Sequence, residues 1–77
     1  MPHIIVKMYK GRSEDMKKDM VEKVTKAITE SLSVNESSVS IAIEEYEPEK
    51  WGKEVYEPDI VGKSETLYRK PGYTPGK

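Results

Sequence analysis

The residue best placed to do chemistry is a proline that directly follows the initiator methionine. Methionine is generally removed before a small second residue, so we expect the mature chain to begin at Pro2 with a free secondary amine. In a partly apolar pocket, desolvation and nearby cations lower the pKa of such an amine. An amine whose pKa lies near neutrality can act as a general base. The position alone also fits a simpler interpretation, in which Pro2 is merely tolerated at the start of a strand.

Other catalytic groups are few. The chain has no Cys and a single His, which excludes disulfides, thiolate zinc sites, cysteine nucleophiles and His-rich metal sites. Ser37 and Ser38 lie in a loop segment without the glycine elbow of a serine nucleophile, which argues against a triad with His3. No pair of carboxylates stands out from the general acidity. We therefore expect no metal site.

The composition indicates one small domain that needs a partner. The chain has 77 residues, of which 35% are apolar and 35% charged, so a single copy has a thin core. A core in a chain of this size rarely supplies more than ~3–5 kcal/mol, and oligomerisation is the remaining source of stability. The net charge of −1 comes from interspersed signs, which argues against a nucleic-acid partner. There is no apolar run of membrane-spanning length and no signal-peptide pattern, so we expect no membrane partner and a cytoplasmic location.

A strand and a helix follow Pro2. Apolar residues alternate along residues 2–9, which predicts a strand with one face on the core. Ser13 is a suitable N-cap for a helix over residues 14–32. Lys17 is the exception on the apolar side of this helix and is expected to snorkel to water. The other residues on that side are Met16, Met20, Val21, Val24, Ala27, Ile28 and Leu32.

A second strand is predicted over residues 39–45, because Val39, Ile41 and Ile43 alternate with polar or small residues. Two strands flanking a helix of this length make a βαβ unit with parallel strands. The fold class is therefore α+β. Alone, such a unit leaves its sheet uncovered on one side and unpaired at its edges. Two chains joined through their sheets would give four strands covered by two helices.

The last third is rich in proline and glycine. Pro58 and the other prolines argue against a long continuous helix, and short helical turns are predicted near residues 49–56 and 64–69. Aromatic and aliphatic residues give this segment enough apolar surface to dock. We predict a single domain over residues 1–77, made of a βαβ core (1–46) and a docking tail (47–77).

The order of motifs resembles the 4-oxalocrotonate tautomerase family over essentially the whole chain. The start MPHIIVKMYKGRSEDMKK has the family's Met-Pro, short strand, Gly-Arg-Ser and amphipathic helix. The segment SSVSIAIEE resembles the second strand of the family, and Trp51 follows it at the interval of the family's aromatic residue. The closing KPGY resembles the branch of small tautomerases active on phenylpyruvate-like enols.

The resemblance implies a role for three residues. Pro2 matches the family's proline, which moves a proton between oxygen and carbon of an enol acid. Arg12 matches the arginine that binds the substrate carboxylate, a task suited to its planar fork of donors. Trp51 matches the aromatic residue that makes the pocket apolar and lowers the pKa of the proline. The simpler interpretations are a solvated loop arginine and ordinary core packing.

One position departs from the family. Type members carry a second substrate-binding arginine where this chain has Ser40, which removes a contact worth ~1.5–3 kcal/mol. A monocarboxylate such as an aryl-pyruvate enol is therefore a better expectation than a dicarboxylate. The assembly is expected to differ as well. Type members of the family are hexamers, in which three dimers pack through the sheet face that here carries His3, Lys7 and Glu44. Because that surface is polar, we expect a homodimer rather than a hexamer.

The resemblance thus implies an isomerase, a cofactor-free keto–enol tautomerase that acts on enols of 2-oxo acids such as phenylpyruvate. Two alternatives stay open. Related sequences use the same proline for dehalogenation or decarboxylation. If Met1 is retained, the Pro2 nitrogen is an amide, and the chain would be a non-catalytic dimeric binding module.

Overall fold

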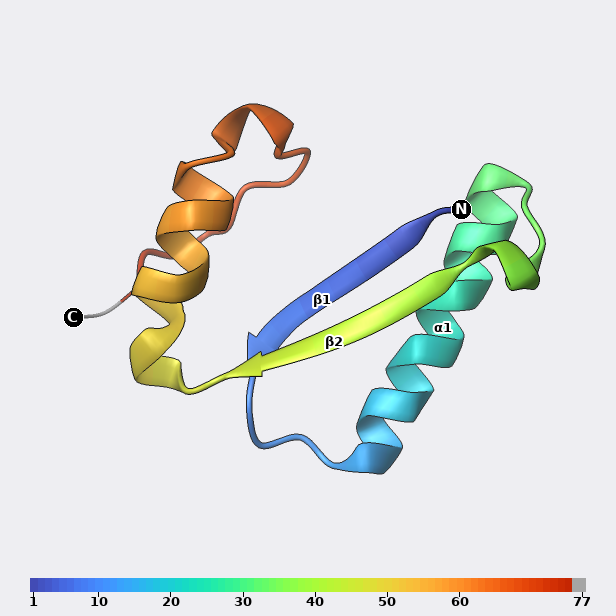
Figure 1. The fold of residues 1–77 in the computed structure, drawn as a ribbon, viewed down its shortest axis with the longest axis horizontal. Coiled ribbons are helices and arrows are strands. Elements are labelled where there is room, and N and C mark those ends of the chain that lie inside the picture. The colour runs from blue at the N-terminus through green and yellow to red at the C-terminus, as the bar shows by residue number, and fades with distance from the viewer. Residues whose placement is uncertain (76–77) are drawn as a thin grey trace. The chain divides into compact units, whose positions relative to one another are not determined.

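The computed structural model describes residues 1–75, in a βαβ order followed by a helical segment (Figure 1). Strand β1 (His3–Tyr9), helix α1 (Glu14–Leu32) and strand β2 (Ser40–Tyr46) come first. A 3₁₀ turn, η1 (Glu36–Ser38), connects α1 to β2. After β2 come a second 3₁₀ turn, η2 (Pro48–Lys50), a π-helix, η3 (Gly52–Val61), and a third 3₁₀ turn, η4 (Ser64–Thr66). The predicted α+β class is confirmed, and η4 lies within the predicted short turn near residues 64–69, whereas the helix predicted near residues 49–56 extends to Val61.

The chain separates into two compact units, Met1–Glu45 and Tyr46–Lys77, and each is described by itself. The boundary lies within one residue of the predicted end of the core. The predicted docking tail (47–77) includes residues 76–77, which lie outside the described residues. That the two units form one domain stays a prediction.

The first unit is a two-stranded sheet with one helix against one face. The arrows of β1 and β2 point the same way, as the βαβ pattern predicts (Figure 1). Helix α1 spans the predicted residues. Its N-cap is Ser13, whose Oγ accepts a hydrogen bond from the Met16 N–H at 3.1 Å. The helix ends at Leu32, and its C-cap Ser33 adopts a left-handed conformation at φ 58°.

The core of the first unit is thin. The half-buried residues of α1 include Met20, Val21, Val24 and Ile28, as predicted, whereas Met16, Ala27 and Leu32 are exposed. Among residues 1–75, only Val55 of the second unit is buried, at 3% exposure. The sheet and α1 of a single chain therefore enclose no fully buried side chain, which agrees with the expected need for a partner.

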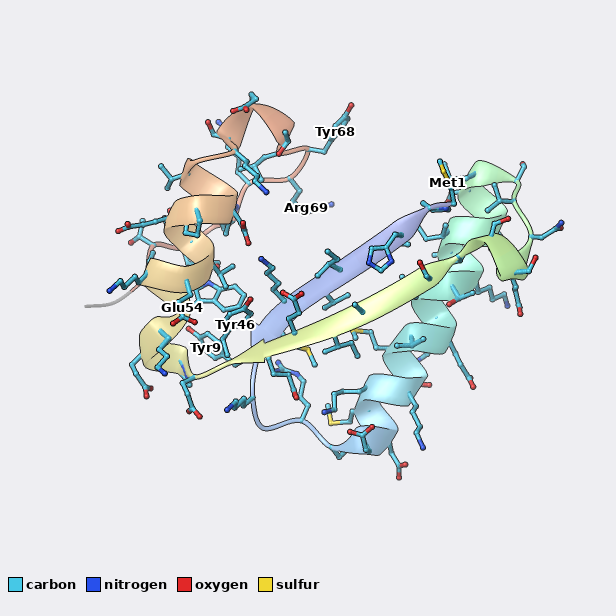
Figure 2. All side chains as sticks on the ribbon, in the orientation of Figure 1. Met1, Tyr9, Tyr46, Glu54, Tyr68 and Arg69 are labelled. Atoms are coloured by element: carbon cyan, nitrogen blue, oxygen red, sulfur yellow. The ribbon has the colours of Figure 1, made fainter. Side chains whose placement is uncertain are left out.

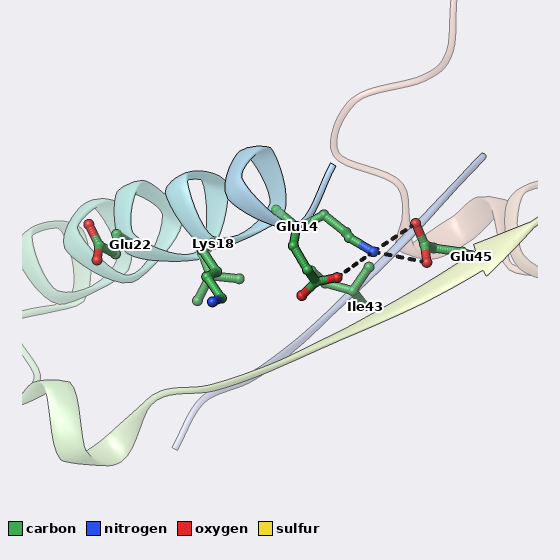
Figure 3. A pocket seen from close by; sticks show the side chains of 7 residues that line it. Glu14, Lys18, Glu22, Ile43 and Glu45 are labelled. Atoms are coloured by element: carbon green, nitrogen blue, oxygen red, sulfur yellow. Dashed lines mark hydrogen bonds and ion pairs between the residues drawn. The ribbon is translucent and has the colours of Figure 1, made fainter. Parts of the chain in front are cut away.

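Lys17 is held between two carboxylates (Figure 3). Its Nζ lies 3.1 Å from Glu14 and 3.2 Å from each carboxylate oxygen of Glu45 on β2. Hydrogen bonds that the Lys17 ammonium donates to Glu14 and then to Glu45 raise the pKa of Lys17 above its ordinary value. The predicted snorkelling to water is therefore wrong. Glu45 continues the alternation of Ile41 and Ile43 and places its carboxylate on the helix-facing side of the sheet.

The second unit contradicts the expectation that Pro58 would end the helix. Helix η3 continues through Pro58 to Val61. In an α-helix the proline ring would clash with the carbonyl four residues earlier, and the wider turn of a π-helix relieves that clash. The Gly62 N–H donates to the Glu57 carbonyl at 2.7 Å, five residues back, as this wider turn requires. A Cβ at Gly62 would lie 2.7 Å from the Pro58 carbonyl oxygen, so a larger residue would displace this backbone.

None of the helices within residues 1–75 combines the length and the apolar character that a bilayer crossing would need.

Candidate active site

Pro2 and Ser40 lie side by side at the start of the two strands. The Ser40 N–H donates a hydrogen bond to the Pro2 carbonyl at 3.1 Å, so the backbone of Pro2 is anchored to β2. Pro2 is half-buried, whereas Met1 is 91% exposed at the free end of β1 (Figure 2). Removal of Met1 would therefore expose the secondary amine of a proline whose carbonyl is already hydrogen-bonded to β2.

The Ser40 hydroxyl pairs with the neighbouring histidine. His3 Nδ1 lies 2.6 Å from Ser40 Oγ. On the same strands, Lys7 Nζ lies 3.8 Å from Glu44 Oε1. Glu45 faces α1, so alternation along β2 turns Ser40 and Glu44 to the opposite face. The prediction that His3, Lys7 and Glu44 share the face away from the helix is confirmed. The sequence interpretation missed that His3 and Ser40 contact each other.

Arg12 follows the C-terminal end of β1, whereas Pro2 directly precedes its first residue. Arg12 borders a pocket of about 130 Å³ between the end of β1 and the first turns of α1. The other lining residues are Met8, Met16, Lys17 and Met20. The seven residues of β1 separate Arg12 from Pro2, and at about 3.3 Å per residue that strand alone spans roughly 20 Å. One chain therefore does not bring these two side chains onto one small substrate.

Trp51 belongs to the second unit, where it is part of an aromatic cluster formed by Tyr46, Trp51, Tyr56 and Tyr73. The rings of Trp51 and Tyr46 pack edge to face with centroids 6.1 Å apart. Trp51 Nε1 donates a hydrogen bond to Tyr73 Oη at 2.8 Å, and the Tyr73 ring lies 5.8 Å from that of Tyr56. The packing contacts of the simpler interpretation of Trp51 are thus present within this unit, and its role in a pocket stays a prediction. Tyr73 was part of the KPGY motif, but its contact with Trp51 was not foreseen.

Comparison with known proteins identifies the family. A family model described as "Tautomerase enzyme" matches residues 2–56, which include Pro2, Arg12, Ser40 and Trp51. The chain belongs to the tautomerase family. As a tautomerase it is an isomerase, and the resemblance noted from the motifs is confirmed.

Relatives match this tautomerase over nearly its whole length. A protein named tautomerase PptA from Cronobacter sakazakii is 40% identical over 74 residues, which are 95% of this chain and 97% of the relative. A probable tautomerase from Xylella fastidiosa is 38% identical over 73 residues, covering 95% of this chain and 89% of the relative.

Solved structures share the fold. The crystal structure of YwhB, a homologue of 4-oxalocrotonate tautomerase, has a TM-score of 0.60 and 38% identity, over 61% of this chain and 77% of that chain. SAR1376, a putative 4-oxalocrotonate tautomerase from methicillin-resistant Staphylococcus aureus, gives the same TM-score at 34% identity, over 61% of this chain and 76% of that one.

Proposed function

We propose that this tautomerase converts enols of 2-oxo acids such as phenylpyruvate to their keto forms, with Pro2 as the general base and without a cofactor. The observation that carries this proposal is the position of Pro2, behind an exposed Met1 and anchored to β2 through Ser40. The amine takes the proton from the enol oxygen as the C=O bond forms. The resulting ammonium delivers that proton to the neighbouring carbon, and the amine is neutral again. One base near neutral pKa serves both steps.

The substrate carboxylate is assigned to Arg12, and this requires two chains. Pro2 and Arg12 lie at opposite ends of β1, so a single chain does not supply both to one substrate. A two-fold axis perpendicular to the strands reverses their direction in the partner. The Pro2 end of one chain then lies beside the Arg12 end of the other. The separation of the two residues, together with the thin core of the first unit, supports a homodimer in which each site is composite.

Trp51 and Ser40 complete the proposed site. Trp51 would form an apolar side of the pocket, which lowers the pKa of the Pro2 amine by disfavouring its charged form. Ser40 stands where type members of the family carry arginine, and its hydroxyl is engaged by His3. It supplies no positive charge for a second carboxylate, which favours an aryl-pyruvate enol over a dicarboxylate. A cytoplasmic location remains part of the proposal.

The direct test is ultraviolet monitoring of phenylpyruvate enol ketonisation by the chain after removal of Met1. We expect a faster loss of the enol absorbance than in buffer, and slower turnover of a dicarboxylate enol. Two other proline-based reactions, dehalogenation and decarboxylation of related acids, are assayed alongside. Turnover in either of those assays without ketonisation would replace the proposed reaction.

Substitution of Arg12 tests the carboxylate contact. Arg12→Ala removes a charge-assisted pair worth about 1.5–3 kcal/mol, so kcat/KM should fall by roughly 10- to 100-fold. Because the carboxylate is bound in the ground state as well, most of the loss should appear in KM. Arg12→Lys keeps the positive charge but loses the planar fork of donors, so its kcat/KM should lie between that of the unsubstituted chain and that of Arg12→Ala. An unchanged KM for Arg12→Ala would return this residue to the role of a solvated loop arginine.

A further inference from the structure

We propose that Tyr73 is a positioning residue that holds the Trp51 indole in the orientation that the active site uses. This role rests on the function proposed above, in which Trp51 forms an apolar side of the pocket around Pro2. It deepens that function, because it assigns the geometry of the pocket to a residue near the C-terminus. All contacts that support it lie within the second unit.

The contact between the two residues is directional. Trp51 Nε1 donates to Tyr73 Oη at 2.8 Å, although the residues are 22 positions apart in the chain. An indole N–H can only donate. This hydrogen bond lies at the surface, where Tyr73 is 46% exposed, so water can accept from Nε1 when the hydroxyl is removed but does not fix the ring. The edge-to-face contact with Tyr46 holds the ring by packing, at a centroid distance of 6.1 Å. Packing alone does not define how the Trp51 indole is rotated within its plane. The hydrogen bond to the Tyr73 hydroxyl defines this rotation.

Tyr73 is itself held in place. Its ring is tilted by 56° against that of Tyr56, and Tyr56 follows the buried Val55 on η3. The segment after Tyr73 returns to the start of the same helix, since a Cβ at Gly52 would lie 3.5 Å from the side chain of Pro75. Tyr73 is therefore packed against η3, the helix that begins next to Trp51. Its hydroxyl can for that reason define the position of the indole.

Tyr73→Phe removes only the hydroxyl and keeps the ring that packs on Tyr56. With the hydrogen bond lost, the indole samples other orientations and admits water to the pocket. We expect kcat/KM for the phenylpyruvate enol to fall by about three- to tenfold. The ionisation in the pH–rate profile should move to higher pH, because better hydration favours the protonated Pro2 amine and raises its pKa. A role limited to stability would leave the profile unchanged while the protein is folded.

Trp51 is the single tryptophan of the chain, so its fluorescence reports on this contact directly. Tyr73→Phe should shift the emission to the red and lower its anisotropy. Tyr68→Phe is the matched control, because it makes the same chemical change at a tyrosine that is fully exposed and extends away from the ribbon (Figure 2). We expect that control to match the unsubstituted chain in emission, rate and pH profile.

A double-substitution cycle separates positioning from a general loss of structure. Trp51→Phe has no N–H, so adding Tyr73→Phe to it should change kcat/KM by less than twofold. Additive losses in the cycle would overturn the positioning role. So would unchanged kinetics and emission in Tyr73→Phe, and in both cases ketonisation by the unsubstituted chain would leave the proposed function intact. No ketonisation by the unsubstituted chain would overturn both.

Discussion

A chain that retains Met1 is expected to lose nearly all of its ketonisation activity. Retention turns the nitrogen of Pro2 into an amide, which has no lone pair available to accept a proton. A positioned general base contributes typically ~10²–10⁴-fold to the rate, and that contribution should disappear. The measurement compares one preparation, made with methionine aminopeptidase inhibited, before and after treatment with the purified aminopeptidase. Intact mass establishes the state of the N-terminus in each sample.

The companion variant Pro2→Ala keeps a terminal amine, but a primary and more mobile one. Its activity should lie between that of the chain with Met1 retained and that of the chain with Met1 removed. The primary amine can still take the proton, but it is held less firmly than the proline ring. In the processed chain the rate should rise with pH through one ionisation, as the amine loses its proton. Trp51→Ala should move that ionisation to higher pH. Full activity in a chain shown by mass to retain Met1 would rule out Pro2 as the base.

Mixing two impaired variants is expected to restore activity if each site combines Pro2 of one chain with Arg12 of its partner. Pro2→Ala and Arg12→Ala chains, unfolded and refolded together, form mixed dimers in which one site is complete and the other carries both changes. With random pairing, about a quarter of all sites are complete in such a two-fold assembly. At low substrate concentration the mixture should therefore recover about a quarter of the full rate.

The control replaces Arg12→Ala with a chain that carries both substitutions. That mixture has no complete site and should stay as slow as its components. Recovery no greater than the sum of the separate variants would show that each chain supplies both residues to its own site. Light scattering on the same samples tests the assembly, for which we expect a mass of two chains. A mass near six chains would overturn the preference for a dimer.

The local pattern of the sequence was sufficient for the elements of the first unit. Ser13 begins α1 as predicted, because N-capping depends on residues within one turn of the helix. Alternation along residues 2–9 and 39–45 placed both strands to within one residue at either end. The order of Met-Pro, Gly-Arg-Ser and the second strand identified the family, since these motifs occur at fixed places along the chain.

Contacts between distant segments were decided only by the tertiary structure. Lys17 meets Glu45 on another element, and Trp51 meets Tyr73 across 22 positions, so neither pair leaves a periodic signal. Helix η3 passes through Pro58 because a π-helical turn accommodates the ring, a geometry that local propensity does not predict. The sequence places Pro2 and Arg12 only ten positions apart, but an extended strand between them carries them to opposite ends of the sheet.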